Sequence, residues 1–124
     1  MGGTIGASLV RAGQEVVLVD RDRAQVEALN DRGLRITGPV DSFTVPVRAV
    51  VPEAVAGSVE LALLCVKSHH TREALDQLAP RLDDAGAIVS VQNGLCEHWI
   101  AERVGAERTV GAFVNYGADV LEPG

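Results

Sequence analysis

Aromatic residues, long apolar runs and an excess of positive charge are scarce or absent in this sequence of 124 residues. Aromatic side chains make up 3% of the residues, so the 47% that are hydrophobic are mostly Val, Leu, Ala and Ile. This composition suits layered α/β packing better than a sandwich built on aromatic cross-strand pairs. No apolar run exceeds six residues, far short of the roughly 20 that a membrane helix needs.

The charge balance and the two cysteines exclude further classes of protein. The formal net charge of −6 is opposite to the basic face that general nucleic-acid binding requires. The N-terminus does not have the charged and apolar segments of a signal peptide. Cys65 and Cys96 lack metal-ligand spacing and indicate reduced thiols. We therefore expect a cytoplasmic protein that binds no metal, nucleic acid or membrane.

Patterns typical of strands and helices alternate along the whole chain. The expected strands are 15–20, 34–37, 43–47, 61–66, 87–91 and 109–114; the expected helices are 3–11, 23–32, 71–82 and 97–104, with a connector at 52–57 and a turn at 83–86. The pair 34–37 and 43–47 alternates with period two and predicts a small antiparallel excursion. The order otherwise predicts one α/β domain over residues 1–124, with a doubly wound, mostly parallel, Rossmann-like sheet.

Two of the apolar strands end in polar residues. The run 61–66 leads into Lys67, and the run 87–91 leads into Gln92-Asn93-Gly94. Continuous apolar runs of this kind predict parallel strands buried on both faces. Because ligands of open α/β sheets bind outside the carboxyl ends of the strands, Lys67 and Asn93 are candidate ligand-binding residues.

The start of the chain contains half of a dinucleotide-binding fingerprint. Gly2 stands where the last glycine of G-x-G-x-x-G would open a helix, and Asp20 ends the next strand 18 residues later. The first strand and the first two glycines of that fingerprint are absent from the sequence. Flexible glycines at a chain start are the plain alternative, and the half-motif alone does not distinguish the two.

The order of these motifs resembles one enzyme family. The matching segments are Met1-Gly2-Gly3, Val17-Leu18-Val19-Asp20-Arg21, Gly33-Leu34-Arg35-Ile36, Cys65-Val66-Lys67-Ser68, Val91-Gln92-Asn93-Gly94-Leu95 and Val110-Gly111-Ala112. In this order and spacing, they resemble ketopantoate reductase, also called 2-dehydropantoate 2-reductase. The resemblance implies NADPH-dependent reduction of 2-dehydropantoate to pantoate, on the route to coenzyme A, by a Rossmann half followed by a helical half.

The resemblance also assigns the nucleotide-binding residues. Gly2 matches the last fingerprint glycine, and Arg21 matches a position that faces the 2′-phosphate of NADPH in many members. A guanidinium suits that phosphate through its forked donors. Asp20 beside it argues for the ribose 2′-hydroxyl of NADH instead. The balance favours NADP(H), with NAD(H) as the alternative.

At the nicotinamide end, Lys67 and Asn93 match cofactor-contacting residues of the family, with Asn93 also near the reacting keto group of the substrate. Gly117 matches a further cofactor-contacting stretch. The family's catalytic lysine belongs to the helical half, so the resemblance places no catalytic residue within residues 1–124. We therefore expect the chain to be a piece truncated at both ends and inactive by itself, with a 2-keto acid as the substrate of the intact enzyme.

Two other functions stay open. The chain could be a non-catalytic nucleotide-binding or interaction module that forms a homodimer through unpaired strand edges. It could also be a Rossmann-type transferase with an adenosyl cofactor, since Asp20 suits any ribose; Arg21 and the pair of Lys67 and Asn93 argue against that. Adjacent His69 and His70 point in different directions and have no third ligand, so we expect them to be surface residues.

Overall fold

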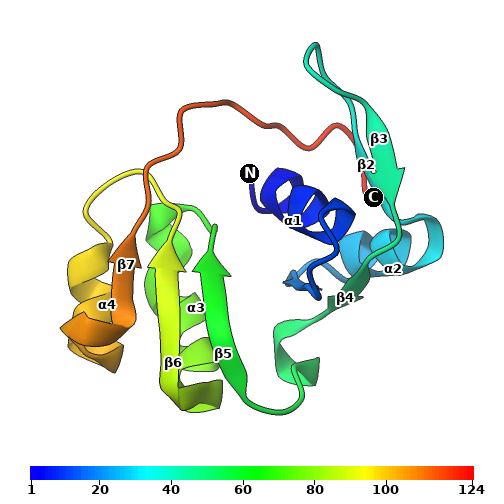
Figure 1. The fold of residues 1–124 in the computed structure, drawn as a ribbon. Coiled ribbons are helices and arrows are strands. Elements are labelled where there is room, and N and C mark those ends of the chain that lie inside the picture. The colour runs from blue at the N-terminus through cyan, green and yellow to red at the C-terminus, as the bar shows by residue number, and fades with distance from the viewer. The chain divides into compact units, whose positions relative to one another are not determined.

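Residues 1–124 are all described in the computed structural model, and they fall into two units (Figure 1). The first unit comprises Met1, Gly3–Val55 and Gly117–Gly124, and the second comprises Gly2 and Ala56–Tyr116. Each unit has its own cluster of buried apolar side chains, so each is described by itself.

The elements follow the predicted alternation. The helices are α1 (Gly2–Arg11), α2 (Arg23–Arg32), α3 (Thr71–Leu78) and α4 (Glu97–Val104). The strands are β1 (Val17–Val19), β2 (Leu34–Ile36), β3 (Phe43–Val45), β4 (Arg48–Val50), β5 (Val59–Leu64), β6 (Leu82–Ser90) and β7 (Thr109–Gly111). Four short 3₁₀ turns connect them: η1 (Pro52–Ala54), η2 (Ser68–His70), η3 (Ala79–Arg81) and η4 (Ala106–Arg108).

The first unit contains two sheets of two strands each. Strands β2 and β3 pair in antiparallel fashion, with Leu34 opposite Val45, which confirms the predicted excursion. Strand β1 pairs in parallel with β4, with Leu18 opposite Ala49. The sequence analysis did not predict β4, because three residues directly after another short strand carry too little periodicity to be recognised.

Residues Asp22 and Gly33 cap the two ends of α2. The Asp22 carboxylate accepts a hydrogen bond of 2.9 Å from the Ala24 N–H, and so satisfies one amide of the first turn. At the other end, Gly33 has a φ of +79°. A Cβ at Gly33 would lie 2.5 Å from the carbonyl oxygen of Val45. Backbone conformation and space therefore both require glycine where α2 turns into β2.

Helix α1 approaches β1 closely, as its small residues predict. A Cβ on buried Gly6 would lie 2.6 Å from Cδ2 of Leu18, so the absence of a side chain lets the helix lie directly on the strand. The buried core of this unit consists of Ala7, Leu29, Leu34, Val45 and Ala49.

A side-chain amide covers part of β4. Asn30 on α2 donates from Nδ2 to the Ala49 carbonyl at 2.8 Å, and its Oδ1 accepts from the Ala49 N–H at 2.9 Å. The amide thus makes the pair of hydrogen bonds that a neighbouring strand would otherwise make. Because Ala49 is buried, leaving its two backbone groups without partners would be costly.

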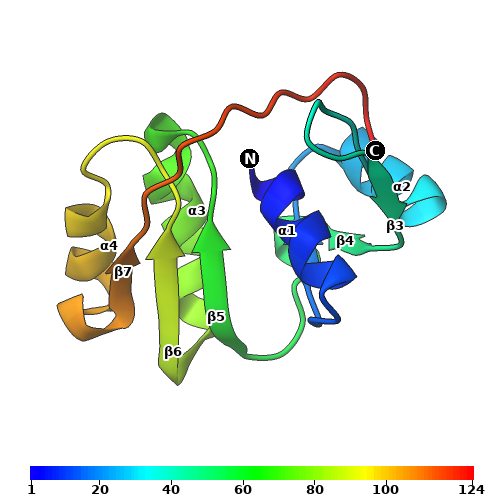
Figure 2. The ribbon, with the colours of Figure 1, turned by 45° about the horizontal axis from the view of Figure 1, so that its top comes forward.

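The second unit is a three-stranded parallel sheet in the order β5-β6-β7. Figures 1 and 2 show α3 and α4 on the same face of this sheet. Leu64 of β5 and Ile88 of β6 pack there against Leu75 of α3 and Ile100 of α4, and Ile88 and Ile100 are completely buried. The parallel arrangement confirms the Rossmann-like α/β class that the alternation of elements predicted.

The predicted burial on both faces is wrong for β5, whereas the residues Ile88–Ser90 of β6 are buried or partly buried. Leu61 and Leu63 of β5 are 61% and 38% exposed, and Val17 and Val19 of β1 are 41% and 52% exposed. In β5, the helices cover only the face that carries Leu64, and alternate side chains of a strand point to opposite faces. Burial of the second face therefore requires contacts that these strands do not have.

Three predicted boundaries also change. The helix expected at 71–82 ends at Leu78, because Pro80 has no N–H with which to continue it. The turn expected at 83–86 is an irregular part of β6, where Val59 lies opposite Leu82 but Leu61 lies opposite Ala87. The last strand stops at Gly111 rather than 114, and the exposed side chains beyond it include Phe113.

Candidate functional site

The carboxyl ends of β5 and β6 bring two of the predicted residues to one edge of the second unit's sheet. Lys67 follows the last residue of β5 by three positions, and Asn93 follows the last residue of β6 by three positions. The two strands are adjacent and parallel, so their ends meet at the same edge. Both side chains are exposed and thus accessible to a ligand.

The loops that carry Lys67 and Asn93 are joined by a residue to which the sequence analysis gave no role. Gln92 donates from Nε2 to the Val66 carbonyl at 2.7 Å and to the Thr71 hydroxyl at 2.8 Å. Val66 directly precedes Lys67, Gln92 directly precedes Asn93, and Thr71 begins α3. One amide therefore links the loop after β5, the loop after β6 and the start of a helix.

The orientation of the Gln92 amide follows from its acceptors. Turning the amide over would place its oxygen against the Val66 carbonyl oxygen, an acceptor facing an acceptor. In the observed orientation, Oε1 is buried and has no hydrogen-bond partner. The hydroxyl of Ser90, two residues earlier in the chain and completely buried, has no partner either. The Gln92 side chain is thus held in place by the two hydrogen bonds that Nε2 donates.

Asp20 and Arg21 lie at the carboxyl end of β1, in the first unit. The Asp20 N–H donates to the Val50 carbonyl at 3.1 Å and extends the ladder with β4. One carboxylate oxygen of Asp20 accepts from the Asp22 N–H at 2.9 Å, so the acid also shapes the turn into α2. Arg21 is exposed. An acid held by the backbone beside an accessible guanidinium is suited to a phosphorylated or free ribose.

The two predicted glycines have different settings. Gly2 is the first residue of α1, whose first turn has no acidic residue and no side-chain cap, so its amides face no carboxylate of their own turn. Gly117 lies in the extended segment after β7, and a Cβ there would meet nothing within 4 Å. Nothing in the structure explains a requirement for glycine at position 117.

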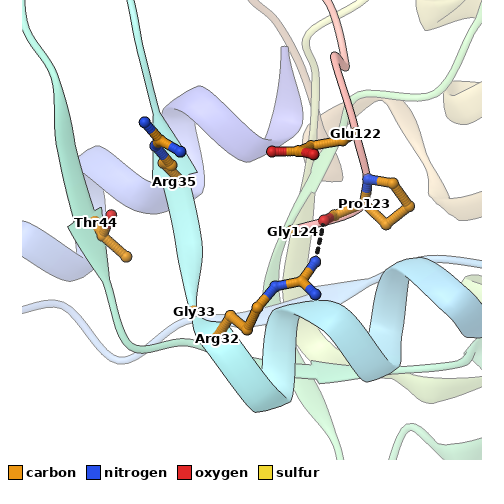
Figure 3. A pocket seen from close by; sticks show the side chains of 7 residues that line it. All are labelled: Arg32, Gly33, Arg35, Thr44, Glu122, Pro123 and Gly124. Carbon is orange, nitrogen blue, oxygen red and sulfur yellow. Dashed lines mark hydrogen bonds between the residues drawn. The ribbon is translucent and has the colours of Figure 1, made fainter.

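The two described pockets do not coincide with the predicted residues. A pocket of about 330 Å³ in the first unit is shown in Figure 3. It is lined by Arg32, Gly33, Arg35, Thr44, Glu122, Pro123 and Gly124. The Arg32 guanidinium already donates to the Pro123 carbonyl at 2.7 Å. A second pocket, of about 240 Å³, is lined by Arg23, Val26, Glu27, Ala49, Val50, Val51 and Ala54.

Several titratable side chains near the sheet edge have other roles. His69 and His70 lie in η2, with His70 Nδ1 3.6 Å from a Glu73 carboxylate oxygen. No group of three or more His, Cys, Asp or Glu side chains is arranged to hold a metal ion. Burial raises the pKa of the Cys65 thiol, which disfavours the nucleophilic thiolate. None of the helices is both long enough and apolar enough to cross a membrane.

Taken separately, the predicted residues of each unit carry groups that suit parts of a nicotinamide dinucleotide. Backbone amides at the start of α1 and the cations of Arg21 and Lys67 suit phosphates. The Asp20 carboxylate suits ribose hydroxyls, and the Asn93 amide can both donate and accept at a carboxamide or carbonyl group. Such a cofactor would supply a hydride, and these residues would supply binding and orientation.

Comparisons with known proteins show the family of the chain. The sequence matches the ketopantoate reductase PanE/ApbA family over residues 1–124. It is 35% identical over 127 aligned positions to the 2-dehydropantoate 2-reductase of Pyrococcus abyssi (strain GE5 / Orsay), with 100% of this chain and 40% of that protein aligned. The corresponding enzyme of Mesorhizobium japonicum (strain LMG 29417 / CECT 9101 / MAFF 303099) is 29% identical over 146 positions, covering 100% of this chain and 44% of that protein.

Solved structures give the same result for the fold. The 2-dehydropantoate 2-reductase from Geobacter metallireducens GS-15 has a TM-score of 0.85 at 31% identity, over 99% of this chain and 41% of that one. D-mandelate dehydrogenase in its complex with NADH and anilino(oxo)acetate has a TM-score of 0.90 at 22% identity, over 99% of this chain and 40% of that one.

The chain thus spans less than half of the length of these relatives. The family match extends from residue 1 to residue 124. Since the family match covers every residue of the sequence, the chain belongs to the ketopantoate reductase PanE/ApbA family.

Proposed function

We propose that residues 1–124 are the nucleotide-binding part of an NADP(H)-dependent reductase of 2-keto acids, with 2-dehydropantoate as the substrate. The observation that carries this proposal is the pair of Lys67 and Asn93 at the carboxyl ends of adjacent parallel strands, in a chain that matches the reductase family throughout. In this proposal the reduction belongs to the protein as a whole, in the cytoplasm on the pantothenate route. Its catalytic lysine is expected outside residues 1–124.

Each predicted residue has a part in this function. The amides at the start of α1, beginning at Gly2, receive the pyrophosphate, and Asp20 and Arg21 bind the adenosine ribose and its 2′-phosphate. Lys67 and Asn93 hold the nicotinamide end, with Asn93 also close to the keto group. Gly117 belongs to a further cofactor-contacting stretch.

The preference for NADP(H) rests on Arg21 outweighing Asp20. A guanidinium makes charge-assisted hydrogen bonds to a phosphate, whereas Asp20 already uses one carboxylate oxygen on the Asp22 N–H. NAD(H) is the alternative cofactor, and in that case the second carboxylate oxygen of Asp20 would accept a hydrogen bond from the ribose 2′-hydroxyl.

Calorimetric titration of the chain with NADPH and with NADH tests this function. Arg21→Ala should weaken NADPH binding about tenfold or more and leave NADH nearly unchanged. Arg23→Ala is the matched control, since Arg23 is an exposed arginine two residues away that pairs with Glu53. Equal losses for both nucleotides in Arg21→Ala would remove the phosphate assignment, and no saturable binding of either nucleotide would remove the proposed function.

A second candidate function is a homodimeric interaction module. It is favoured by the single-sided pairing of β1 and β5 and by their exposed apolar side chains Val17, Val19 and Leu61. In that case the molar mass measured by light scattering should rise with protein concentration. A constant monomer mass would count against it.

A further inference from the structure

We propose that Gln92 is a positioning residue: its side-chain amide ties the loop after β5 to the loop after β6 and thereby fixes Lys67 and Asn93 as one binding edge for the nicotinamide end of the cofactor. This inference rests on the proposed function for its ligand. The tie itself depends only on contacts within the second unit.

The first step of the argument is connectivity. The two hydrogen bonds of Gln92 Nε2 reach residues 26 and 21 positions earlier in the chain, Val66 and Thr71. The Val91 N–H donates to the Leu64 carbonyl at 2.9 Å, and beyond it no backbone hydrogen bond joins the two loops. The Gln92 amide therefore continues the link between β5 and β6 past the end of the sheet.

The second step is rigidity. Thr71 is completely buried, and it begins α3, which packs on the sheet through Leu75. Gln92 thus connects the loops to the buried start of a helix that packs on the sheet. Lys67 follows Val66, and Asn93 follows Gln92; both are exposed. Their side chains are long or adaptable, so the position of the backbone decides where their polar groups can reach.

The third step is specificity of the residue type. The Val66 carbonyl and the Thr71 hydroxyl both accept from the same nitrogen, which requires an NH₂ group. Glutamate has the same size but no such donor, and leucine is similar in size but apolar. The unpaired, buried Oε1 of Gln92 shows that the amide is oriented by its donors.

Two ligands separate positioning of the nicotinamide from general stability. Gln92→Glu and Gln92→Leu should weaken binding of NADPH about tenfold, because two hydrogen bonds are lost. They should leave 2′-phospho-ADP-ribose, which lacks the nicotinamide, within about twofold. Thr71→Ser keeps the hydroxyl and should bind both ligands as the wild type does. Gln77→Glu, the same chemical change at an exposed site of α3, is the charge control.

A measurement without any nucleotide tests the tie independently of the proposed function. In Gln92→Leu, hydrogen exchange should accelerate at the amides of His70, which donates to the Lys67 carbonyl, and Val91. The Ala112 amide, which donates to Ser90 on the other side of β6, should keep its rate.

The outcomes distinguish the two proposals. Unchanged exchange in the loops would overturn the tie, whatever the nucleotides do. Faster exchange together with equal losses for NADPH and 2′-phospho-ADP-ribose would overturn the positioning role in favour of a structural one. If the wild type bound neither ligand, the proposed function and the nicotinamide role would both fail, while the exchange data would still decide whether Gln92 joins the loops.

Discussion

The two units of this chain hold their polar strand ends in different ways. In the first unit, the Asp20 carboxylate accepts a hydrogen bond from the Asp22 N–H, and the Asp20 N–H donates to the Val50 carbonyl of β4. In the second, Gln92 reaches across 26 and 21 positions of sequence to bind Val66 and Thr71. Hydrogen bonds within one turn therefore hold the residue that we expect to bind the ribose. The residues that we expect to bind the nicotinamide are held by contacts between segments distant in sequence.

The hydrophobic cores of the two units also differ. The second unit packs two helices on one face of a three-stranded parallel sheet, with Ile88 and Ile100 completely buried. The first unit has two short sheets and relies on a close helix contact at Gly6 and on the Asn30 amide. We expect large apolar truncations to be most damaging in the second unit and changes of special residues to be most informative in the first.

The largest expected effect is that of Ile88→Ala, which should destabilise the second unit by about 3 kcal/mol through loss of buried methyl groups and the cavity they leave. Trp99, the single tryptophan, lies in that unit, so its fluorescence during urea unfolding reports on it. Leu29→Ala in the other core is the matched control and should change the far-UV circular dichroism transition more than the fluorescence. Equal shifts of the fluorescence midpoint in both variants would show that the units unfold together.

Gly33→Ala should cost about 2 kcal/mol, because alanine at a φ of +79° is strained and its Cβ would meet the Val45 carbonyl oxygen. Gly13→Ala provides the comparison, since Gly13 has a φ of +83° but open space around it. It should cost about 1 kcal/mol. Urea midpoints followed by far-UV circular dichroism would measure both, and an equal cost would mean that steric contact at Gly33 contributes nothing.

Asn30→Ala should destabilise the first unit by about 1–2 kcal/mol, because it leaves the backbone N–H and carbonyl of buried Ala49 without their partners. Asn30→Asp keeps the acceptor and loses the donor, so it should have an intermediate effect at neutral pH. The amide exchange rate of Ala49 is the direct measurement. An unchanged rate in Asn30→Ala would contradict the role of this amide as a substitute for a strand.

The smallest expected effect concerns two acids near the surface, Asp41 in the first unit and Asp83 in the second. The Ala85 amide and the Ser58 hydroxyl lower the pKa of Asp83, and the Arg11 guanidinium lowers the pKa of Asp41, both from 3.8. Since the folded pKa is the lower one, the stabilisation is present above pH 3.8 and is lost as the pH falls through the lowered value.

Asp83→Asn and Asp41→Asn should therefore each differ from the wild type in stability near neutral pH, and the difference should shrink in acid. Added salt should reduce the effect at Asp41 more, because it depends on an exposed ion pair. Thermal melts at several pH values and salt concentrations would measure this, with Asp84→Asn as the control. A difference from the wild type that grew as the pH fell would have the wrong sign.

Much of the fold could be predicted because its signals are local. The caps of α2 at Asp22 and Gly33, the small face of α1 and the antiparallel pair β2–β3 all follow from residues a few positions apart. The candidate residues could be selected for a similar reason, since Asp20 and Lys67 directly follow apolar runs and Arg21 and Asn93 each stand one residue further on.

Other features could not be predicted because distant residues produce them. Strand β4 is recognisable only through its pairing with β1 and through Asn30, 19 residues before Ala49. The exposure of Leu61 depends on which face of β5 the helices cover, and an apolar run does not contain that information. Gln92 stood in a motif beside Asn93, but its partners became visible only in the folded chain.

The sequence by itself determined the alternation of strands and helices, the two ends of α2 and the family, because propensity, capping and apolar periodicity act over a few residues. The tertiary structure alone decided which strand faces are covered, where β4 pairs and how Gln92 joins the loops beside Lys67 and Asn93. These depend on hydrogen bonds and packing between segments far apart in the chain, whose meeting is fixed only when the whole fold has formed.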